Sequence, residues 1–241
     1  MGDLGIFTLI IMLGIIVQSF AGFAGSLLAI PLYSIFFVPK NIIPAHSLVM
    51  LLVNIILVLE SKKHLDWKKI KKLQIAGLIG VPIGAYCLAY FPSSIIRIII
   101  SIISLIFGLL FLVKIKVHFK ENTVTQSSVG LLSGFLGGSI SESGPPVVIY
   151  GLSREWPKDT FRTCLLTYFL VLSVMANLSY FCLGMFNKGT LKFSLFAIIP
   201  ALIAGWIGTK VKNLVSEELY KKVIIFIIIA VAIIGLMKVI F

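Results

Sequence analysis

Two short runs rich in glycine, serine and proline interrupt stretches of the chain that are otherwise apolar. The first is Ala21–Ser26, with Pro31 shortly after it, and the second is Gly134–Pro146. Glycine and proline at this density do not continue a straight helix. Where a helix begins after such a break, its first backbone N–H groups are free and carry partial positive charge. The two runs are therefore candidate anion-binding elements.

The candidates for substrate binding in these runs are small residues, residues with a hydroxyl group, or residues that flank a break. They are Gly22, Phe23, Gly25, Ser26, Pro31, Gly134, Gly137, Gly138, Ser139, Ser141, Ser143, Gly144 and Pro145. We expect Pro31 and Pro145 at the first positions of short helices that follow the breaks, where proline is favoured. The alternative for each glycine is that it only allows two helices to pack closely. For the two runs taken together, the binding interpretation is preferred.

Glu142 lies inside the second run and is the sharpest candidate for a coupling group. An ionised carboxylate at membrane depth costs at least a few kcal/mol, so this side chain should be protonated, paired or facing water. The alternative is that it lies at a hairpin mouth and meets solvent. Other coupling or gating candidates are polar residues in or near apolar segments, with helix bridging, interface packing or orientation as the alternative roles: His46, Arg162, Gln18, Asn54 and Asn177.

Composition assigns the chain to the membrane. Of its 241 residues, 59% are hydrophobic and 12% are charged, and the mean hydropathy is +1.10. A soluble domain is closer to one quarter charged. The net charge of +12 resides in short basic clusters between apolar segments, which is typical of loops that obey the positive-inside rule and not of nucleic-acid binding. Three cysteines without metal-ligand or disulfide spacing predict no metal, no cofactor and no disulfide scaffold.

The apolar stretches predict an all-α, multi-pass protein of the cell membrane. A spanning helix needs about 20 apolar residues. Six stretches meet this requirement without interruption, at about 42–60, 70–91, 94–114, 160–184, 190–209 and 219–241. The two remaining apolar stretches, 4–38 and 126–153, are the ones that contain the breaks.

An internal repeat relates the two halves. Gly22-Phe23-x-Gly25 recurs 112 residues later as Gly134-Phe135-x-Gly137, and Gly80-x-x-x-Gly84 matches Ala204-x-x-x-Gly208 at an offset of 124. Each half then contains one broken segment followed by three uninterrupted spans. We predict an N-terminal repeat over 1–116, a linker over 117–125 and a C-terminal repeat over 126–241.

The distribution of Lys and Arg favours one topology. If each broken segment crosses the membrane once, giving eight spans in two four-span halves, the basic residues divide nearly evenly between the two sides. If each enters and leaves on one side as a hairpin, 16 of the 21 lie inside and only Lys40, Arg97, Lys188, Lys192 and Lys238 lie outside. The positive-inside rule therefore favours two inverted repeats, each with a broken helical hairpin and three transmembrane helices.

Taken together, these motifs resemble the sulfite exporter TauE/SafE family. The resemblance rests on the paired Gly-Phe-x-Gly elements, the nearby prolines, Ala45-His46-Ser47, Arg162-Thr163-Cys164 and the duplicated layout. It implies a secondary carrier, often an exporter, for sulfur-containing anions such as sulfite or sulfoacetate. The chain departs from the family at Gly25-Ser26, where members usually carry a fuller glycine run, and at Ser141-Glu142-Ser143, where a carboxylate lies beside the expected anion site.

Two other function classes compete with this interpretation. An anion channel would share the helix-end site and conduct without proton coupling. An intramembrane enzyme is less favoured, because the three histidines are scattered and neither HExxH nor GxSxG occurs. The expected partners are a small anion and the lipid bilayer. The sequence leaves the substrate, the direction of transport and the oligomeric state open.

Overall fold

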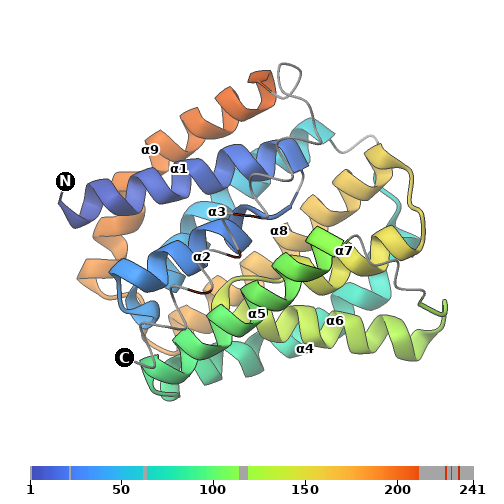
Figure 1. The fold of residues 1–241 in the computed structure, drawn as a ribbon, viewed down its shortest axis with the longest axis horizontal. Helices are drawn as coiled ribbons and strands as arrows, with labels where there is room; N and C mark the ends of the chain where they lie inside the picture. The colour runs from blue at the N-terminus through green and yellow to red at the C-terminus, as the bar shows by residue number, and fades with distance from the viewer. Residues whose placement is uncertain are drawn as a thin grey trace.

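The computed structural model describes residues 2–21, 23–61, 64–113 and 119–211, together with the isolated positions 226, 229 and 233. This part of the chain forms nine helices and no strand, which confirms the all-α prediction (Figure 1). In chain order the helices are α1 (Asp3–Ala21), α2 (Gly25–Phe36), α3 (Pro39–Ser61), α4 (Trp67–Tyr90), α5 (Ser93–Val113), α6 (Thr123–Ile140), α7 (Gly144–Ser153), α8 (Lys158–Cys182) and α9 (Lys188–Val211).

Within the described residues, five helices are long and apolar enough to cross a membrane. They are α3, α4, α5, α8 and α9, and they coincide with five of the six spans predicted from the sequence. The sixth predicted span, 219–241, lies outside the described residues apart from three isolated positions. On α4, the side chains of Ile75, Ile79 and Ile83 are 54%, 60% and 51% exposed. Their four-residue spacing forms one apolar stripe, as a helix face towards lipid requires.

Each broken segment folds back on itself as two antiparallel helices. In the first, Tyr33 on α2 stacks on Phe7 of α1 with ring centroids 4.9 Å apart, and its hydroxyl donates to Phe7 O at 3.3 Å. In the second, Gln126 Nε2 on α6 donates to the hydroxyl oxygen of Tyr150 on α7 at 3.0 Å. Ser133 Oγ of α6 also donates to the Ser143 carbonyl beside the break. The segments 4–38 and 126–153 are therefore helical hairpins.

The breaks themselves are shorter than the sequence suggested. Pro31 was expected to start a helix, and this expectation is wrong, because Pro31 lies inside α2 and is buried. Pro145 and Pro146 do occupy the first turn of α7, as expected. The glycines from Gly134 to Gly138 do not interrupt α6, which ends only at Ile140. Glycine is compatible with a helix when neighbouring helices supply the packing that its missing side chain cannot.

The interface between α4 and α6 explains why α6 continues through its glycines. Gly80 and Gly84 of α4 face Gly134 and Gly138 of α6 so closely that a Cβ on any of them would collide with the backbone of the opposite helix. Only glycine lets two helix backbones approach to this degree. The repeat motif Gly-Phe-x-Gly therefore occupies two different settings, a break in the first half and a packed helix in the second.

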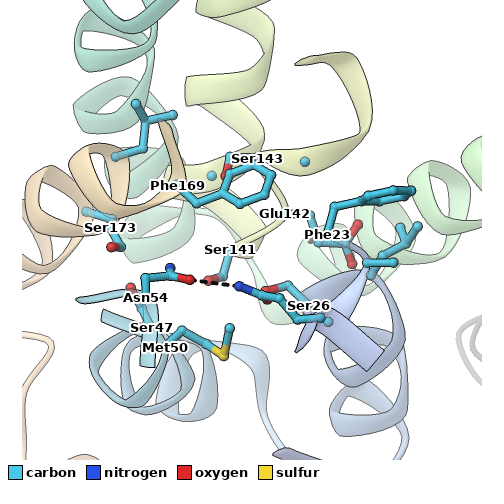
Figure 2. Close-up of a pocket in the computed structure, with 18 of the residues that line it drawn as sticks. Phe23, Ser26, Ser47, Met50, Asn54, Ser141, Glu142, Ser143, Phe169 and Ser173 are labelled. Carbon is cyan, nitrogen blue, oxygen red and sulfur yellow. Dashed lines mark hydrogen bonds between the residues drawn. The ribbon is translucent and has the colours of Figure 1, made fainter. Parts of the chain in front are cut away.

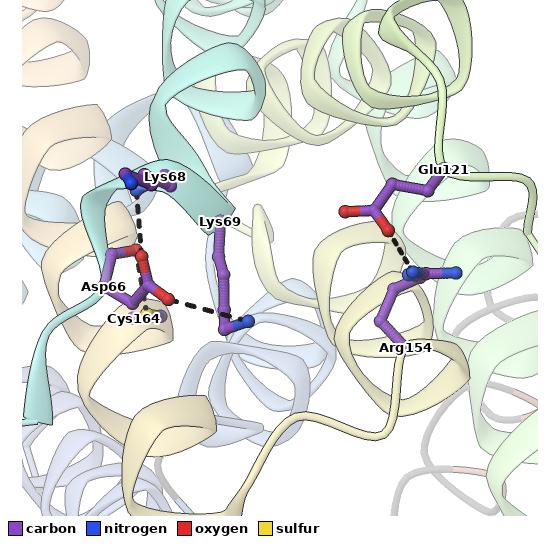
Figure 3. A network of polar contacts seen from close by, with 6 residues as sticks. All are labelled: Asp66, Lys68, Lys69, Glu121, Arg154 and Cys164. Atoms are coloured by element: carbon purple, nitrogen blue, oxygen red, sulfur yellow. Dashed lines mark hydrogen bonds and ion pairs between the residues drawn. The ribbon is translucent and has the colours of Figure 1, made fainter.

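Apart from the two breaks, the connections between helices gather at the two ends of the molecule. At the end on the right of Figure 1, Thr163 Oγ1 donates to Ser61 O at 2.9 Å, and Lys72 Nζ donates to Thr123 Oγ1 at 2.8 Å. Figure 3 shows further polar contacts at this end, which involve Asp66, Lys68, Lys69, Glu121, Arg154 and Cys164. These are segments that the charge distribution predicts to share the inner side.

At the opposite end, two basic side chains cap the C-terminal carbonyls of helices. Lys40 Nζ donates to Ala89 O at 2.8 Å, near the end of α4. Arg97 donates to Ser34 O and, at 2.9 Å, to Phe37 O, at the end of α2. Cations at helix C-termini are favourable because the macrodipole is negative there. Both residues belong to the smaller group predicted to lie outside.

Candidate functional site

The two breaks meet at one buried pocket between the hairpins (Figure 2). Its wall combines the end of α1, both breaks with the helix starts that follow them, and one face each of α3 and α8. The lining residues are Gln18, Phe23, Ala24, Gly25, Ser26, Leu27, Ser47, Met50, Asn54, Gly137, Ser141, Glu142, Ser143, Gly144, Pro145, Phe169, Leu172, Ser173 and Ala176. The cavity measures about 60 Å³, whereas one water needs about 10–15 Å³. It has room for a small anion.

The first break presents the start of α2 to the pocket. Ala24, at φ 72° and ψ −1°, adopts the left-handed conformation that lets the chain reverse. The first hydrogen bond of the helix runs from Leu28 N–H to Ala24 O at 3.1 Å. The N–H groups of Gly25, Ser26 and Leu27 precede this bond and have no carbonyl of their own helix within reach. All three residues line the pocket.

Gly25 is held against α1 so tightly that no side chain fits there. A Cβ on Gly25 would lie 2.7 Å from both Gln18 Oε1 and Gly14 O. The start of α2 therefore rests on the backbone of α1, and this contact fixes where the free N–H groups point.

Replacing Gly25 with alanine is expected to weaken anion binding at least tenfold, because α2 must shift away from α1 and Gln18. Gly205→Ala is the matched control, because it adds the same methyl group on α9, outside the pocket lining, with Ile15 Cγ2 at 3.6 Å, an ordinary contact. Equilibrium binding of a small oxyanion to both purified variants measures the difference. Equal affinities would contradict the role given to Gly25.

The second break is closed by a left-handed cap. Ser141, at φ 56° and ψ 27°, ends α6, and its N–H donates to Gly137 O at 3.1 Å, which is the αL motif of helix C-termini. α7 starts at Gly144 and carries Pro145 and Pro146 in its first turn, so two of its first N–H groups are missing. Both helix dipoles point their positive ends at the pocket, but α2 offers more donors than α7 does.

Glu142 is the one acidic residue among the described residues that line the pocket. It is 1% exposed, and neither carboxyl oxygen has a hydrogen-bond partner within the described part of the chain. Among the residues that the structure describes, no Lys or Arg lines the pocket. Figure 2 places Glu142 beside Phe23, between the two breaks. An unpaired ionised carboxylate is costly in such surroundings, whereas the protonated form is a neutral donor.

Three pairs of polar side chains support the wall. Ser26 Oγ lies 3.0 Å from His46 Nε2, and Gln18 Nε2 donates to Asn54 Oδ1 at 2.7 Å (dashed in Figure 2). In the third pair, Asn177 Nδ2 donates to the hydroxyl oxygen of Ser47 at 3.0 Å and to Ser47 O at 3.3 Å.

The structure brings eight of the thirteen substrate-binding candidates to the pocket: Phe23, Gly25, Ser26, Gly137, Ser141, Ser143, Gly144 and Pro145. Gly22 lies outside the described residues. The other four, Pro31, Gly134, Gly138 and Ser139, do not line the pocket: Gly134 and Gly138 pack against α4, and the Ser139 hydroxyl donates to Phe135 O.

The coupling candidates divide in the same way. Glu142, Gln18 and Asn54 line the pocket. His46 and Asn177 lie directly behind it, each bonded to a serine of the wall. Arg162 is near the start of α8 and does not belong to the lining.

Sequence reasoning missed the contribution of α8 and most of that of α3. Phe169, Ser173 and Ala176 follow one another at four and three residues, the spacing of one helix face. On α3, Ser47 and Asn54 are seven residues apart and thus share a face as well. The signal available in the sequence was the recurrence of polar residues at helical spacing within an apolar span. Apolar residues of the pocket wall, such as Phe169, give no such signal.

Aromatic rings close the side of the pocket nearest Phe23. The Phe23 ring meets the Phe161 ring edge to face with centroids 6.3 Å apart, and Phe161 in turn meets Trp156 at 6.4 Å. Phe161 and Trp156 belong to the end of the molecule where the basic loops gather. The ring contacts thus connect the wall of the pocket to this end of the molecule.

The family model described as "Sulfite exporter TauE/SafE" matches residues 6–234, a range that includes both breaks and every residue of the pocket. No curated protein and no solved structure matches the chain.

Proposed function

Because the chain belongs to the sulfite exporter TauE/SafE family, we propose that it is a secondary carrier that exports sulfite, sulfoacetate or a related organosulfonate through the pocket between its two hairpins. The family confirms the resemblance drawn from the sequence and implies a membrane transporter of sulfur anions, not an enzyme. The observation that carries the proposal is the meeting of two helix starts, those of α2 and α7, in one buried pocket.

The start of α2 is the proposed subsite for the anionic group. Its free N–H groups, its positive dipole end and the hydroxyl of Ser26 converge on the pocket, and such helix starts bind oxyanions without a cationic side chain. Helix starts of broken segments serve the same purpose in other carriers with discontinuous helices. The three oxygens of a sulfonate or sulfite group match several donors held in one place.

Glu142 is the proposed proton-coupling group. Two negative charges in one buried pocket repel each other, so an anion enters best when Glu142 is protonated. Anion and proton then cross together. A dianion with one proton still carries one negative charge, and a membrane potential that is negative inside drives this charge outward with about 2.3 kcal/mol per 100 mV.

Two inverted repeats are the proposed architecture, with the boundaries predicted from the sequence at 1–116, 117–125 and 126–241. An exchange of packing partners supports this arrangement, because α1 of the first half packs along α9 of the second, and α6 of the second packs along α4 of the first. Gly84 lies against α6 and Gly208 against Ser19 of α1, and these two glycines occupy matching positions of the repeat. The hairpins then enter the cell membrane from opposite faces.

The proposal is tested by flux measurements in proteoliposomes that contain the purified chain. Sulfite, sulfoacetate, thiosulfate, taurine and sulfate are offered in turn, with and without an imposed pH gradient. We expect saturable flux of a sulfur oxyanion that responds to the gradient. Flux that rises without saturation would favour an anion channel, and no flux of any sulfur anion would overturn the proposed substrate class.

A further inference from the structure

The polar pairs around the pocket share one feature: in each, one partner occupies the oxygen of a residue in the wall. The wall residues are Ser26, Ser47 and Asn54, and all three line the cavity. A hydroxyl whose oxygen accepts a hydrogen bond from behind keeps its own proton free to donate forwards. An amide whose oxygen is occupied likewise keeps its N–H₂ group free.

The geometry around Asn177 leaves no choice of direction. Its Nδ2 lies 2.8 Å from Ser173 O, 3.3 Å from Ser47 O and 3.0 Å from Ser47 Oγ. The two carbonyl oxygens only accept, so the atom that faces them is the N–H₂ group of Asn177 and not its oxygen. Ser47 Oγ therefore accepts from Asn177, and the Ser47 proton is left for the cavity.

The surroundings of His46 select its tautomer. The ring is fully buried, Nε2 lies 3.0 Å from Ser26 Oγ, and Nδ1 has no partner. A buried N–H without a partner is rarer and more costly than a buried lone pair without one. The proton therefore belongs on Nε2, which donates to Ser26 Oγ and leaves the Ser26 hydroxyl proton free to point into the cavity.

Gln18 likewise occupies the acceptor oxygen of Asn54. Its Nε2 donates to Asn54 Oδ1 at 2.7 Å, so the Asn54 amide keeps its N–H₂ group for other partners. Gln18, His46 and Asn177 come from α1, α3 and α8, yet each turns a wall residue into a donor.

We propose that Gln18, His46 and Asn177 are positioning residues that turn Asn54, Ser26 and Ser47 into a set of hydrogen-bond donors, which makes the pocket selective for anions whose binding atoms only accept hydrogen bonds. This inference deepens the proposed function and rests on it. The recognised group is a deprotonated oxyanion, such as the oxygens of sulfite or of a sulfonate. The cradle that recognises it is built from neutral donors rather than from Lys or Arg.

Double-mutant cycles test the proposal, with the Kd of sulfite measured by titration calorimetry on the detergent-purified full chain. A hydrogen bond to a charged group contributes about 1.5–3 kcal/mol, so Ser47→Ala is expected to weaken binding about tenfold to a hundredfold. Asn177→Leu should weaken it to a similar degree, because the Ser47 proton can then turn away. The Ser47→Ala/Asn177→Leu double variant should bind no more weakly than the weaker single variant.

The pair of His46 and Ser26 provides a second test if Asn177→Leu does not fold. His46→Gln retains an N–H donor towards Ser26 and is expected to bind sulfite within about threefold of the unmodified chain, whereas His46→Leu should match Ser26→Ala. Ser173 provides a comparison within the pocket, because its hydroxyl already donates to Leu170 O at 2.9 Å. Ser173→Ala should therefore weaken binding far less than Ser47→Ala.

The possible results separate the two proposals. Strong coupling between Ser47 and Asn177 and rescue by His46→Gln support the donor-directing role. Independent, multiplicative losses, or equal affinities of His46→Gln and His46→Leu, overturn it while leaving the carrier function intact. If the unmodified chain binds neither sulfite nor sulfoacetate, the proposed function fails, and the inference that rests on it fails as well.

Discussion

Replacing Gly138 with alanine is expected to disrupt the packing of α4 against α6 and to lower the stability of the fold strongly. The new Cβ would collide with the carbonyl oxygen of Val81 and lie 2.8 Å from the backbone nitrogen of Ala85. Backbone atoms cannot rotate aside as a flexible side chain does, so the two helices must separate. Overpacking of this kind costs about 1–3 kcal/mol when side chains can adjust, and that figure is a lower bound here.

Gly205→Ala is the matched control, since it adds the same methyl group to a glycine of α9, where the nearest atom is Ile15 Cγ2 at 3.6 Å. Thermal denaturation of both variants in detergent, followed by size-exclusion chromatography, gives the comparison. We expect Gly138→Ala to melt several degrees below the unmodified chain, or to purify poorly, and Gly205→Ala to melt within about one or two degrees of it. Equal melting temperatures would show that α4 and α6 are not held at the observed distance.

The sequence predicted five of the apolar helices well because the requirements of the bilayer act on composition directly. Twenty apolar residues without a charge have few alternatives to a spanning helix, and α3, α4, α5, α8 and α9 begin and end within three residues of the predicted bounds. The hairpins were foreseen from the positions of Lys and Arg, which report the side of each loop whatever the local conformation.

The exact breaks were not predictable, because glycine has two opposite uses. Gly25 starts a helix after a reversal, whereas Gly134 and Gly138 lie inside one, and their nearest sequence neighbours do not distinguish the cases. The difference is the presence of α4, which supplies Gly80 and Gly84 from about 50 residues away in the chain. Pro31 was misplaced for a related reason: α2 had already begun at Gly25, six residues earlier.

The lining of the pocket was predictable at the breaks and hidden where it depends on helix packing. Ser26, Ser141 and Ser143 follow directly from the break positions. Asn177 and His46 were recognised as polar residues in apolar surroundings, but their bonds to Ser47 and Ser26 depend on how α8 meets α3 and how α2 meets α3. Such contacts join residues that are 130 and 20 positions apart, and a single sequence does not encode them as a local pattern.

Glu142→Gln is expected to abolish the response of transport to a pH gradient while leaving exchange of the anion intact. Glutamine has the shape of the protonated carboxyl group and cannot release a proton, so the pocket stays neutral at every pH. In the unmodified chain, one proton that moves with each anion allows one unit of pH difference to sustain about a tenfold difference in anion concentration. In the variant this accumulation should fall to that of a vesicle without a gradient.

The measurement is sulfite uptake into proteoliposomes with an acidic exterior, compared with counterflow exchange at equal pH on both sides. Glu121→Gln makes the same chemical change on an exposed side chain paired with Arg154, at the end of the molecule away from the pocket, and should retain the full response to the gradient. If Glu142→Gln still accumulates sulfite against its gradient, proton coupling belongs to another group. If exchange is lost as well, Glu142 serves to hold the anion or the break in place. Glutamine keeps only one of the two carboxyl oxygens as an acceptor, so this result would mean that the other oxygen is required. Retained exchange with lost accumulation is the one combination that assigns the proton to Glu142, since it separates the site where the anion binds from the group that couples its movement.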